Sequence, residues 1–282
     1  MQIIFDKINY VYSSGTAFER HAIKDINLTI HKGEFVGLIG HTGSGKSTLI
    51  QHMNGLIKAT SGHIYFNGLD IYDQDYKLRE LRSKVGLVFQ YPEHQLFETS
   101  VFKDVNYGPK NLGLDKLEAE VRTYEALKMV GIGEELWDAS PFELSGGQKR
   151  RVAIAGILAM KPEVLILDEP TAGLDPRGRD DILEQISVLH KESGMTIILV
   201  THSMEDVANY VDRILVMNQG SLVMDEPTKT VFSRYKELEQ MHLAAPQVTY
   251  IMNALKQEGF HVATDITTVN EAKLEILKEL KK

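Results

Sequence analysis

The chain has 282 residues, of which 43% are hydrophobic and 25% charged; this fits one large globular domain, or one domain with an appendage, and excludes a disordered or fibrous protein. We expect no nucleic-acid partner, because the net charge is −8 and proteins that bind nucleic acid carry basic surfaces. Since cysteine is absent, the chain forms no disulfide and no thiolate metal site, which fits a reducing compartment.

The apolar segments are too short to cross a membrane. Val164–Leu167 and Thr196–Val200 are among the longest, and both are far below the roughly 18 residues that a spanning helix needs. The N-terminus, MQIIFDKINY, has no basic stretch ahead of an apolar core and so does not resemble a signal peptide. We therefore expect a cytoplasmic protein.

Short strands and glycine-containing turns dominate the first ninety residues. Alternating apolar and polar residues predict strands over Ile3–Tyr12 and Ile26–Ile30, which begin an N-terminal antiparallel β subdomain. Glu34–Gly40 is a short buried strand that runs into a glycine-rich loop. The other elements expected here are a helix at Ser47–Asn54, a hairpin of Gly62–Phe66 with Leu69–Ile71, and a strand at Lys84–Gln90.

The sequence pattern of residues 91–160 differs from that of the strand-rich segment before it. Charged amphipathic stretches such as Lys116–Val130 predict a helical subdomain here. Strands return at Val164–Leu167 and Thr196–Val200, with a helix over Asp180–Lys191 between them. This alternation is typical of a parallel sheet covered by helices. We therefore expect an α/β fold in which the helical subdomain is inserted between two halves of one sheet.

A hairpin of Arg213–Gln219 and Ser221–Asp225 closes the expected domain, which spans residues 1–240. Residues 241–282 predict a small C-terminal helical extension. It contains an amphipathic helix led by Pro246 and a last helix over Glu271–Leu280, for which Asn270 is the expected N-cap. Apolar residues recur every three positions on the last helix, at Leu274, Leu277 and Leu280.

A phosphate-binding loop is the strongest functional signal. The segment GHTGSGKS fits the pattern GxxxxGK[ST] and lies between a predicted strand and a predicted helix. Its glycines let backbone N–H groups surround phosphate oxygens, while Lys46 reaches the β- and γ-phosphates and the Ser47 hydroxyl binds Mg²⁺. The nucleotide-binding residues are Gly40, His41, Thr42, Gly43, Ser44, Gly45, Lys46, Ser47 and Thr48.

Two further motifs gain meaning beside this loop. The strand Val164–Leu167 ends in Asp168 and Glu169, where Asp168 could bind Mg²⁺ and Glu169 could deprotonate an attacking water; a solvated loop charge is the alternative for Glu169. The segment LSGGQ precedes a basic helix, so its backbone N–H groups could form a second anion site. The alternative is a helix N-cap and nothing more. Its candidate binding residues are Ser145, Gly146, Gly147 and Gln148.

In this order the motifs resemble those of ATP-binding cassette ATPases, over nearly all of residues 1–230. The resemblance implies a P-loop NTPase fold with a RecA-like parallel sheet, and it implies ATP and Mg²⁺ as cofactors. It rests on Gly40–Thr48 (Walker A), Gln90, Leu144–Gln148 (signature), Val164–Glu169 (Walker B), Ala172–Asp175 and His202.

The resemblance also implies roles. Glu169 is the catalytic base, His202 contacts the γ-phosphate and holds the arrangement of Glu169 and water, and Gln90 senses Mg²⁺ and that water. The resulting catalytic set is Glu169, His202, Gln90 and Lys46, and the metal ligands are Ser47, Gln90 and Asp168.

Members of this family pair head to tail, so that the signature of one subunit covers the nucleotide of the other. By this resemblance the segment Ser145–Gln148 completes a partner's site, and Asp175 links the two sites. Tyr12 is the best candidate to stack on adenine, with Tyr10 and Phe18 as alternatives; a tyrosine on a sheet surface is the alternative interpretation of Tyr12.

Narrower stretches resemble the ATPase subunits of energy-coupling-factor transporters (CbiO-like), and most closely the second of their two paralogous ATPases. The stretches are the N-terminal GTAFER and the segments QHMNGL, FQYPEHQLF, GPKN, PFEL and RRVAIAG. The resemblance implies a paralogous ATPase partner (a heterodimer, or a homodimer), a transmembrane coupling protein and a small substrate-capturing membrane protein. It places the chain peripherally at the cytoplasmic face of the membrane, powering uptake of vitamins or transition-metal ions.

The apolar segment after Gln90 could seat a helix of the membrane partner, with Glu93 or a neighbouring carboxylate pairing to an arginine there; the alternative is a loop packed on its own subdomain. For the C-terminal extension, the choice is between holding two subunits together, as in similar ATPases, and packing on its own domain. Three other functions are the alternatives to this interpretation. They are an ATPase subunit of a conventional importer or exporter, a soluble cassette protein of translation or DNA repair, and a non-hydrolysing scaffold.

Overall fold

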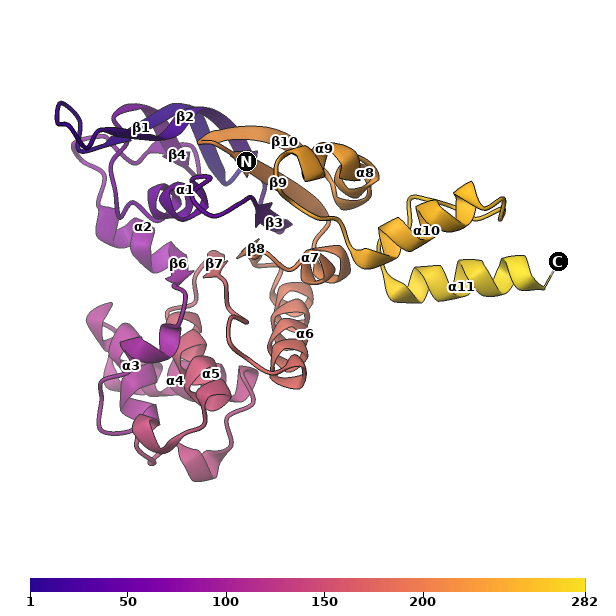
Figure 1. The fold of residues 1–282 in the computed structure, drawn as a ribbon. Helices are drawn as coiled ribbons and strands as arrows, with labels where there is room; N and C mark the ends of the chain where they lie inside the picture. Colours follow the sequence, from indigo (N-terminus) through magenta and orange to yellow (C-terminus); the bar gives the residue numbers. More distant parts are fainter. Residues whose placement is uncertain (282) are drawn as a thin grey trace.

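The structure is a computed structural model, and it describes residues 1–281. Two sheets form the body of the molecule (Figure 1): an antiparallel sheet with the order β2-β1-β4-β5, and a six-stranded sheet with the order β10-β9-β3-β8-β7-β6. The strands are β1 (Ile3–Tyr12), β2 (Arg20–Ile30), β3 (Phe35–Ile39), β4 (Ser61–Phe66), β5 (Leu69–Asp70), β6 (Val85–Val88), β7 (Val164–Asp168), β8 (Thr196–Val200), β9 (Arg213–Asn218) and β10 (Ser221–Pro227).

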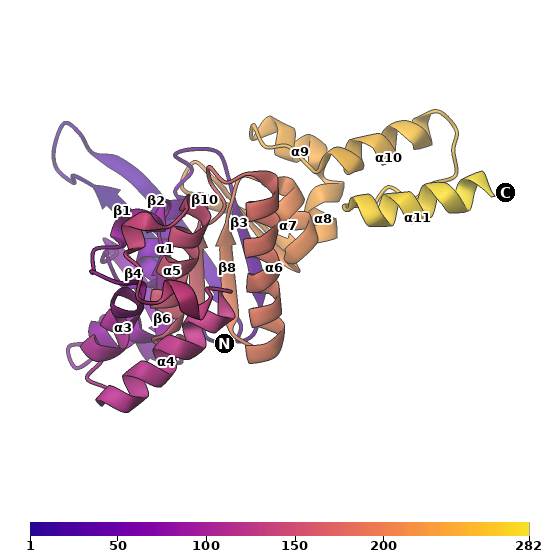
Figure 2. The ribbon, with the colours of Figure 1, turned by 90° about the horizontal axis from the view of Figure 1, so that it is seen from below.

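The helices take three positions relative to the sheets. One group covers the sheets, a second forms a lobe beyond edge strand β6, and α10 and α11 project from the body side by side, both running away from it (Figures 1 and 2). The helices are α1 (Lys46–Met53), α2 (Leu78–Lys84), α3 (Val101–Asn111), α4 (Lys116–Met129), α5 (Gly146–Leu158), α6 (Pro176–Ser193), α7 (Met204–Tyr210), α8 (Thr228–Ser233), α9 (Tyr235–Gln240), α10 (Gln247–Gln257) and α11 (Val269–Leu280).

Five strands of the larger sheet are parallel, and β10 pairs antiparallel with β9. The unit β7-α6-β8 is the expected strand–helix–strand alternation, and the α3–α5 lobe lies in the chain between β6 and β7. The predicted α/β fold, with its antiparallel N-terminal sheet, parallel sheet, helical insertion and helical C-terminal extension, is therefore confirmed.

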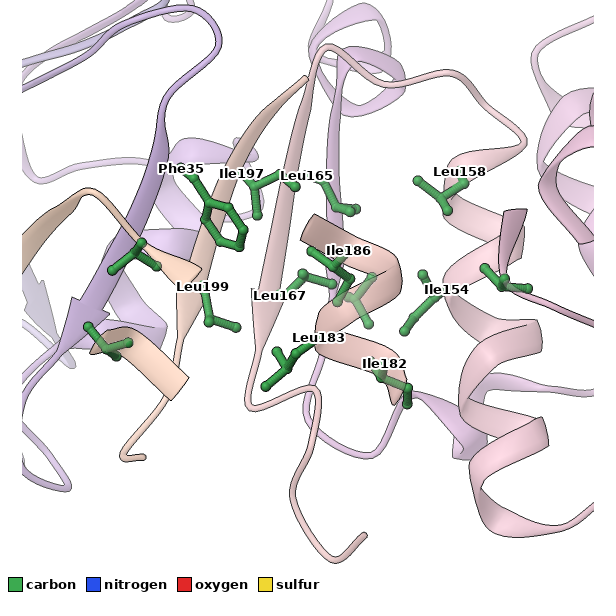
Figure 3. Close-up of a cluster of buried hydrophobic side chains, with 14 of the residues drawn as sticks. Phe35, Ile154, Leu158, Leu165, Leu167, Ile182, Leu183, Ile186, Ile197 and Leu199 are labelled. Carbon is green, nitrogen blue, oxygen red and sulfur yellow. The ribbon is translucent and has the colours of Figure 1, made fainter. Parts of the chain in front are cut away.

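Alternate residues of the buried strands point to opposite faces of the six-stranded sheet, and each face has its own core. On one face, Leu165 and Leu167 of β7 pack with Ile182 of α6 and Ile154 of α5 (Figure 3). On the other, Ile166 lies in a cluster shared with α1 and the antiparallel sheet. Because α5 shares the first core with β7, the signature segment at its N-terminus is anchored to the sheet.

Several boundaries differ from expectation. Strand β2 starts at Arg20, well ahead of Ile26, and α2 is an additional helix before β6. The N-cap of α11 is Thr268, whose side chain accepts a hydrogen bond from the backbone N–H of Glu271, so the assignment of Asn270 as N-cap is wrong. A hydroxyl three residues before a glutamate is the stronger capping pattern.

The C-terminal pair α10–α11 has a small core of its own, built on Val248, Met252 and Ala272. The leucine face of α11 lies outside this core: Leu274 is 70% exposed, Leu277 43% and Leu280 70%. The alternative that these leucines pack on their own domain is therefore wrong. The division at residue 240 and a pairing role for the extension stay predictions.

Candidate functional site

The segments that follow four neighbouring parallel strands meet at one edge of the larger sheet. Strand β3 leads into the loop Gly40–Gly45, β8 into His202, β7 into Asp168 and Glu169, and β6 into Gln90. The carboxyl ends of parallel strands lie together, and ligands of open α/β sheets bind there. The topology thus gathers residues that are far apart in the sequence into one candidate site.

Two glycines shape the loop where backbone approaches closely. A Cβ on Gly40 would lie 2.4 Å from the carbonyl oxygen of Met217, and one on Gly45 would lie 2.7 Å from that of Ala22. Gly45 also has a φ of +109°, which favours glycine. No side chain caps the first turn of α1, so its N–H groups are open to an anion.

The outer part of the loop is held from two sides. The His41 ring has Nδ1 2.8 Å from the carbonyl oxygen of Thr42 and Nε2 3.2 Å from Oδ1 of Asn218, which ends β9. On the other side, Nη2 of Arg20 donates to the carbonyl oxygen of Gly43 at 3.3 Å. These contacts fix the loop from neighbouring strands.

Lys46 lies folded back over this loop. Its Nζ donates to the carbonyl oxygens of Gly40 at 2.6 Å and His41 at 3.2 Å. Burial lowers the pKa of Lys46, and the negative charges of Glu169 and Asp168 oppose that shift. Phosphate oxygens are stronger acceptors than neutral carbonyls, so a triphosphate in the loop can draw the ammonium group from both.

Asp168 ends β7 and is 9% exposed. Burial and the neighbouring Glu169 raise its pKa above the ordinary value, although the charge of Lys46 and a hydrogen bond from the Ser47 side chain act in the opposite direction. The Ser47 hydroxyl and Asp168 carboxylate bring together two oxygen ligands of the kind that Mg²⁺ prefers.

The surrounding residues fit a metal that arrives with a nucleotide. Within residues 1–281, no group of three or more His, Cys, Asp or Glu side chains is placed to hold a metal ion. Mg²⁺ usually takes one or two carboxylates together with substrate phosphates. The Ser44 hydroxyl in the loop is 1% exposed and has no hydrogen-bond partner, which leaves the cradle one polar contact short.

Glu169 and His202 form a direct pair. Oε2 of Glu169 lies 2.9 Å from Nδ1 of His202, and the side-chain exposures are 13% and 78%. The backbone of Glu169 has a φ of +51°, and its N–H donates to the carbonyl oxygen of Val200 at 2.9 Å. Glu169 is therefore a held carboxylate and not a solvated loop charge, while His202 presents its ring to solvent.

Tyr12 lies beside the phosphate loop. Its hydroxyl is 3.2 Å from Oγ1 of Thr48, and its ring is set edge-on to Tyr10 with centroids 4.7 Å apart. Tyr10 in turn contacts the ring of the buried His52, whereas Phe18 is 85% exposed in the β1–β2 loop. Of the three aromatic candidates, Tyr12 is the one with a contact to the predicted nucleotide-binding segment.

The signature segment forms a capping box at the start of α5. The backbone N–H of Gln148 donates to Oγ of Ser145 at 3.3 Å, and the backbone N–H of Ser145 donates to Oε1 of Gln148 at 2.9 Å. A Cβ on Gly146 or Gly147 would meet no atom within 4 Å. The two glycines thus lie against open space, where another molecule can approach.

Asp175 and Gln90 flank the carboxylates. Oδ1 of Asp175 accepts from the backbone N–H groups of Arg177 and Gly178 at 3.1 and 3.0 Å, so Asp175 is the N-cap of α6. Gln90 is exposed and follows β6, the strand that pairs with β7. Both side chains lie on segments that directly adjoin the strand carrying Asp168.

Arg150 of α5 joins three segments of the site, a role that the sequence motifs did not reveal. It is 2% exposed, its guanidinium binds both carboxylate oxygens of Glu93 at 2.8 and 3.1 Å, and it donates to the carbonyl oxygens of Pro170 and Ala172. Burial raises the pKa of Glu93, but these hydrogen bonds outweigh it and leave the pKa below its usual value. Since both oxygens are taken, the hypothesis that Glu93 pairs with a partner's arginine is not supported.

Comparison with known proteins agrees with this site. The model of the ABC transporter family matches residues 23–172. That match, together with full-length relatives at more than 50% identity, shows that the chain belongs to the family of ATP-binding cassette transporter ATPases. The resemblance inferred from the motifs is thus confirmed.

Full-length relatives indicate which kind of transporter ATPase the chain resembles. The chain is 57% identical over 99% of its length, and 97% of the relative, to the "Energy-coupling factor transporter ATP-binding protein EcfA2" of Clostridium tetani. It is 55% identical over 99% of its length, and 98% of the relative, to the protein of that name in Clostridium perfringens.

Solved structures agree with the fold. The structure of cbiO1 from Clostridium perfringens, described as part of the ABC transporter complex cbiONQ, matches 89% of this chain and 98% of its own at 42% identity and a TM-score of 0.75. A dimeric ATP-binding cassette bound to ADP and Pi in a post-hydrolysis state matches 80% of this chain and 98% of its own, at 31% identity and a TM-score of 0.71. Within residues 1–281, every helix falls short of the length and apolarity needed to cross a membrane.

Proposed function

We propose that this protein binds and hydrolyses MgATP as an ATPase subunit of an energy-coupling factor transporter, at the cytoplasmic face of the membrane. The observation that carries the proposal is the pair of adjacent carboxylates at the end of β7. Asp168 interacts with Ser47 and Lys46 of the phosphate loop, while Glu169 holds His202. We therefore assign one carboxylate to metal and phosphate, and the other to water.

The loop residues bind the triphosphate. The N–H groups of the Gly40–Ser47 segment and the first turn of α1 receive phosphate oxygens, and Lys46 exchanges its two carbonyl partners for them. Ser47 and Asp168 hold Mg²⁺, with Gln90 as a further contact. When bound, Mg²⁺ neutralises negative charge on the β- and γ-phosphates.

Glu169 orients and deprotonates the attacking water. His202 is its partner at 2.9 Å, and it contacts the γ-phosphate while keeping the carboxylate in place. Tyr12, fixed by Tyr10 and Thr48, stacks on adenine. Because the signature segment lies against open space, we assign the Ser145–Gln148 turn to the nucleotide of a second subunit, with Asp175 linking the two sites.

A cavity of about 380 Å³ supports coupling to a membrane partner. It lies between α2, α3 and α5, and aromatic and aliphatic groups of Phe97, Tyr107, Val152 and Ile157 line it. Phe97 is 58% exposed and Tyr107 46%. Apolar grooves of this kind accept the apolar face of a short helix, which we assign to the transmembrane coupling protein.

Isolation of the tagged chain from its native membranes tests the transporter class. We expect it to bring down a paralogous ATPase, one coupling protein and a small substrate-capturing membrane protein, in a complex that imports a vitamin or a transition-metal ion. Two copies of one permease would instead indicate a conventional importer or exporter. Recovery without any membrane protein would indicate a soluble cassette protein.

Glu169→Gln tests the chemistry. The variant keeps the shape of the side chain but removes the base, so turnover should fall by about 10²–10⁴-fold while ATP affinity is retained. Glu192→Gln, an exposed change on α6, is the matched control and should hydrolyse ATP at the rate of the unaltered protein. Retained turnover in Glu169→Gln would remove Glu169 from its role.

A further inference from the structure

Asp206 is a buried carboxylate to which no function has been assigned above. It lies in the first turn of α7, four residues after His202, and is 3% exposed. Its backbone N–H donates to Oγ of Ser203 at 3.3 Å, and the Ser203 side chain also hydrogen-bonds the carboxylate. Oδ2 has no hydrogen-bond partner. A buried carboxylate oxygen without a partner carries a free-energy cost and requires an explanation.

Arg179 is the cation that faces this carboxylate. Its Nε lies 3.6 Å from Oδ1 of Asp206 and 3.4 Å from Oδ1 of Asp180, so one N–H group stands between two acids. A separation of 3.6 Å is too long for a hydrogen bond. The side chain is 37% exposed and therefore has room to move. Arg179 and Asp206 therefore form an ion pair without a direct hydrogen bond, which we call half formed.

Arg179 and Asp206 belong to segments to which different functions have been assigned. Arg179 lies in the first turn of α6, where its backbone N–H donates to the carbonyl oxygen of Asp175 at 3.0 Å. Asp206 follows the loop that carries His202, the partner of Glu169. The Arg179–Asp206 pair therefore connects the turn assigned to the subunit interface with the loop assigned to hydrolysis.

The charges around Asp206 favour a stronger pairing with Arg179. Burial raises the pKa of Asp206, while Arg179 and Ser203 lower it and the acids Asp180 and Glu205 raise it. Tyr210 faces the same group, since Asp180, Asp206 and Glu184 add to the effect of burial in raising its pKa. A guanidinium fork can serve both oxygens of one carboxylate at once, which neutralises the buried charge and supplies the missing partner of Oδ2.

We propose that Asp206 is a positioning residue for ATP hydrolysis: when a second subunit engages the Asp175 turn, Arg179 leaves Asp180, binds both oxygens of Asp206, and so holds the His202 loop against Glu169. The proposal rests on the proposed function, because it assumes hydrolysis in a pair of subunits. A positioning role for Asp206 differs from a purely structural one in one respect. The bonds from Arg179 to both carboxylate oxygens of Asp206 form only when two subunits are assembled with nucleotide.

The test uses the full chain, assembled with the ATPase subunit that co-purifies with it and supplied with MgATP. Asp206→Asn and Arg179→Gln should each lower kcat by about tenfold, a change of about 1.4 kcal/mol in the barrier, with KM within about twofold of the unaltered value. The double variant should lose no more than either single one, because both remove the same interaction. Asp180→Asn is the matched control, and its kcat should not fall.

Thermal unfolding separates positioning from mere stability. Asp206→Asn removes a buried charge whose Oδ2 has no hydrogen-bond partner, so its Tm should not fall, whereas a structural role requires a lower Tm. Unchanged kcat in either single variant, losses that multiply in the double variant, or a rise in KM without a fall in kcat would each overturn the proposal. If Asp206→Asn does not fold, Arg179→Gln, a change at a partly exposed side chain, decides between the two outcomes alone. Absence of MgATP turnover in the unaltered complex would refute the proposed function instead.

Discussion

Adjacent carboxylates at the end of β7 differ because of their neighbours. Asp168 is enclosed beside Ser47 and Lys46, and burial raises its pKa. Glu169 turns away through a left-handed backbone conformation and meets His202. The enclosed side chain is suited to a metal and the other to a water, and this difference supports the two roles that we propose for residues of the same chemistry.

The raised pKa of Asp168 predicts a cost to stability. An acid whose pKa is higher in the folded than in the unfolded chain loses stability as the pH rises from its ordinary value of 3.8 through the folded value. In the nucleotide-free protein at pH 7, Asp168→Asn should therefore raise the free energy of unfolding by about 0.5–2 kcal/mol, the range of single stabilising changes. The variant should also lose Mg²⁺-dependent turnover.

Denaturant unfolding of Asp168→Asn at two pH values checks this prediction. The gain should be present at pH 7 and should shrink below pH 3.8, where the unaltered side chain is protonated in both states. The exposed Asp212→Asn serves as control and should change stability by no more than about 0.5 kcal/mol. A less stable Asp168→Asn at pH 7 would contradict the argument.

Motif spacing identified most of the candidate residues because phosphate chemistry needs particular side chains at fixed intervals. It could not identify Arg150, whose partners Glu93, Pro170 and Ala172 come from other segments. It also could not show the half-formed pair of Arg179 and Asp206. Such contacts depend on packing between elements and leave no pattern in the local sequence.

At the scale of elements, two helix N-termini have been assigned to phosphate, and their glycines differ in surroundings. Gly45, ahead of α1, has a positive φ and a carbonyl oxygen 2.7 Å from the Cβ position, whereas the Cβ position of Gly146, at the start of α5, is open. Glycine is required at position 45 because the surrounding backbone leaves no room for a side chain. At position 146 the absence of a side chain leaves space for a second subunit.

Alanine at each position should separate the two roles. Gly45→Ala should weaken ATP binding by the isolated chain by at least about tenfold, because the loop must move to admit the Cβ. Gly146→Ala should fold and bind ATP normally but lose turnover in the assembled complex. Isothermal titration and ATPase assays measure the two effects. Normal turnover in Gly146→Ala would contradict the assignment of the signature to a partner's nucleotide.

The hydrophobic pattern predicted the long or strongly periodic elements, and it failed where few apolar residues carry the signal. Helix α2 has Leu81 as its buried residue, so no apolar stripe indicates it. The N-cap of α11 was recoverable, since Thr268 and Glu271 have the spacing of a capping box. Asn270 was an acceptable cap by residue type alone.

For the whole molecule, the α10–α11 pair stands away from the body (Figure 2). The leucine face of α11 is exposed. A three-residue repeat of leucines suits a core and an interface equally, so the sequence could not decide between them. The exposure of Leu274, Leu277 and Leu280 now favours an interface. We keep the prediction that this extension holds two subunits together.

A charge on that face should weaken pairing. Leu277→Glu should raise the dissociation constant of the nucleotide-free pair of ATPase subunits by about tenfold or more, as for other buried interface anchors. Lys273→Glu, an exposed change on the same helix, should have a much smaller effect. Sedimentation of the full-length chains measures both. Equal effects would show that the leucine face takes no part.

The most direct test of the account is the mass of the hydrolysis-blocked protein in the presence of nucleotide. Glu169→Gln, mixed with its natural ATPase partner and MgATP, should form a stable two-subunit complex that dissociates when the nucleotide is removed. Lys46→Ala, which lacks the phosphate contact, should remain single under the same conditions. If Glu169→Gln also stays single with MgATP and its partner present, the signature turn does not cover a shared nucleotide, and the proposed mechanism is wrong.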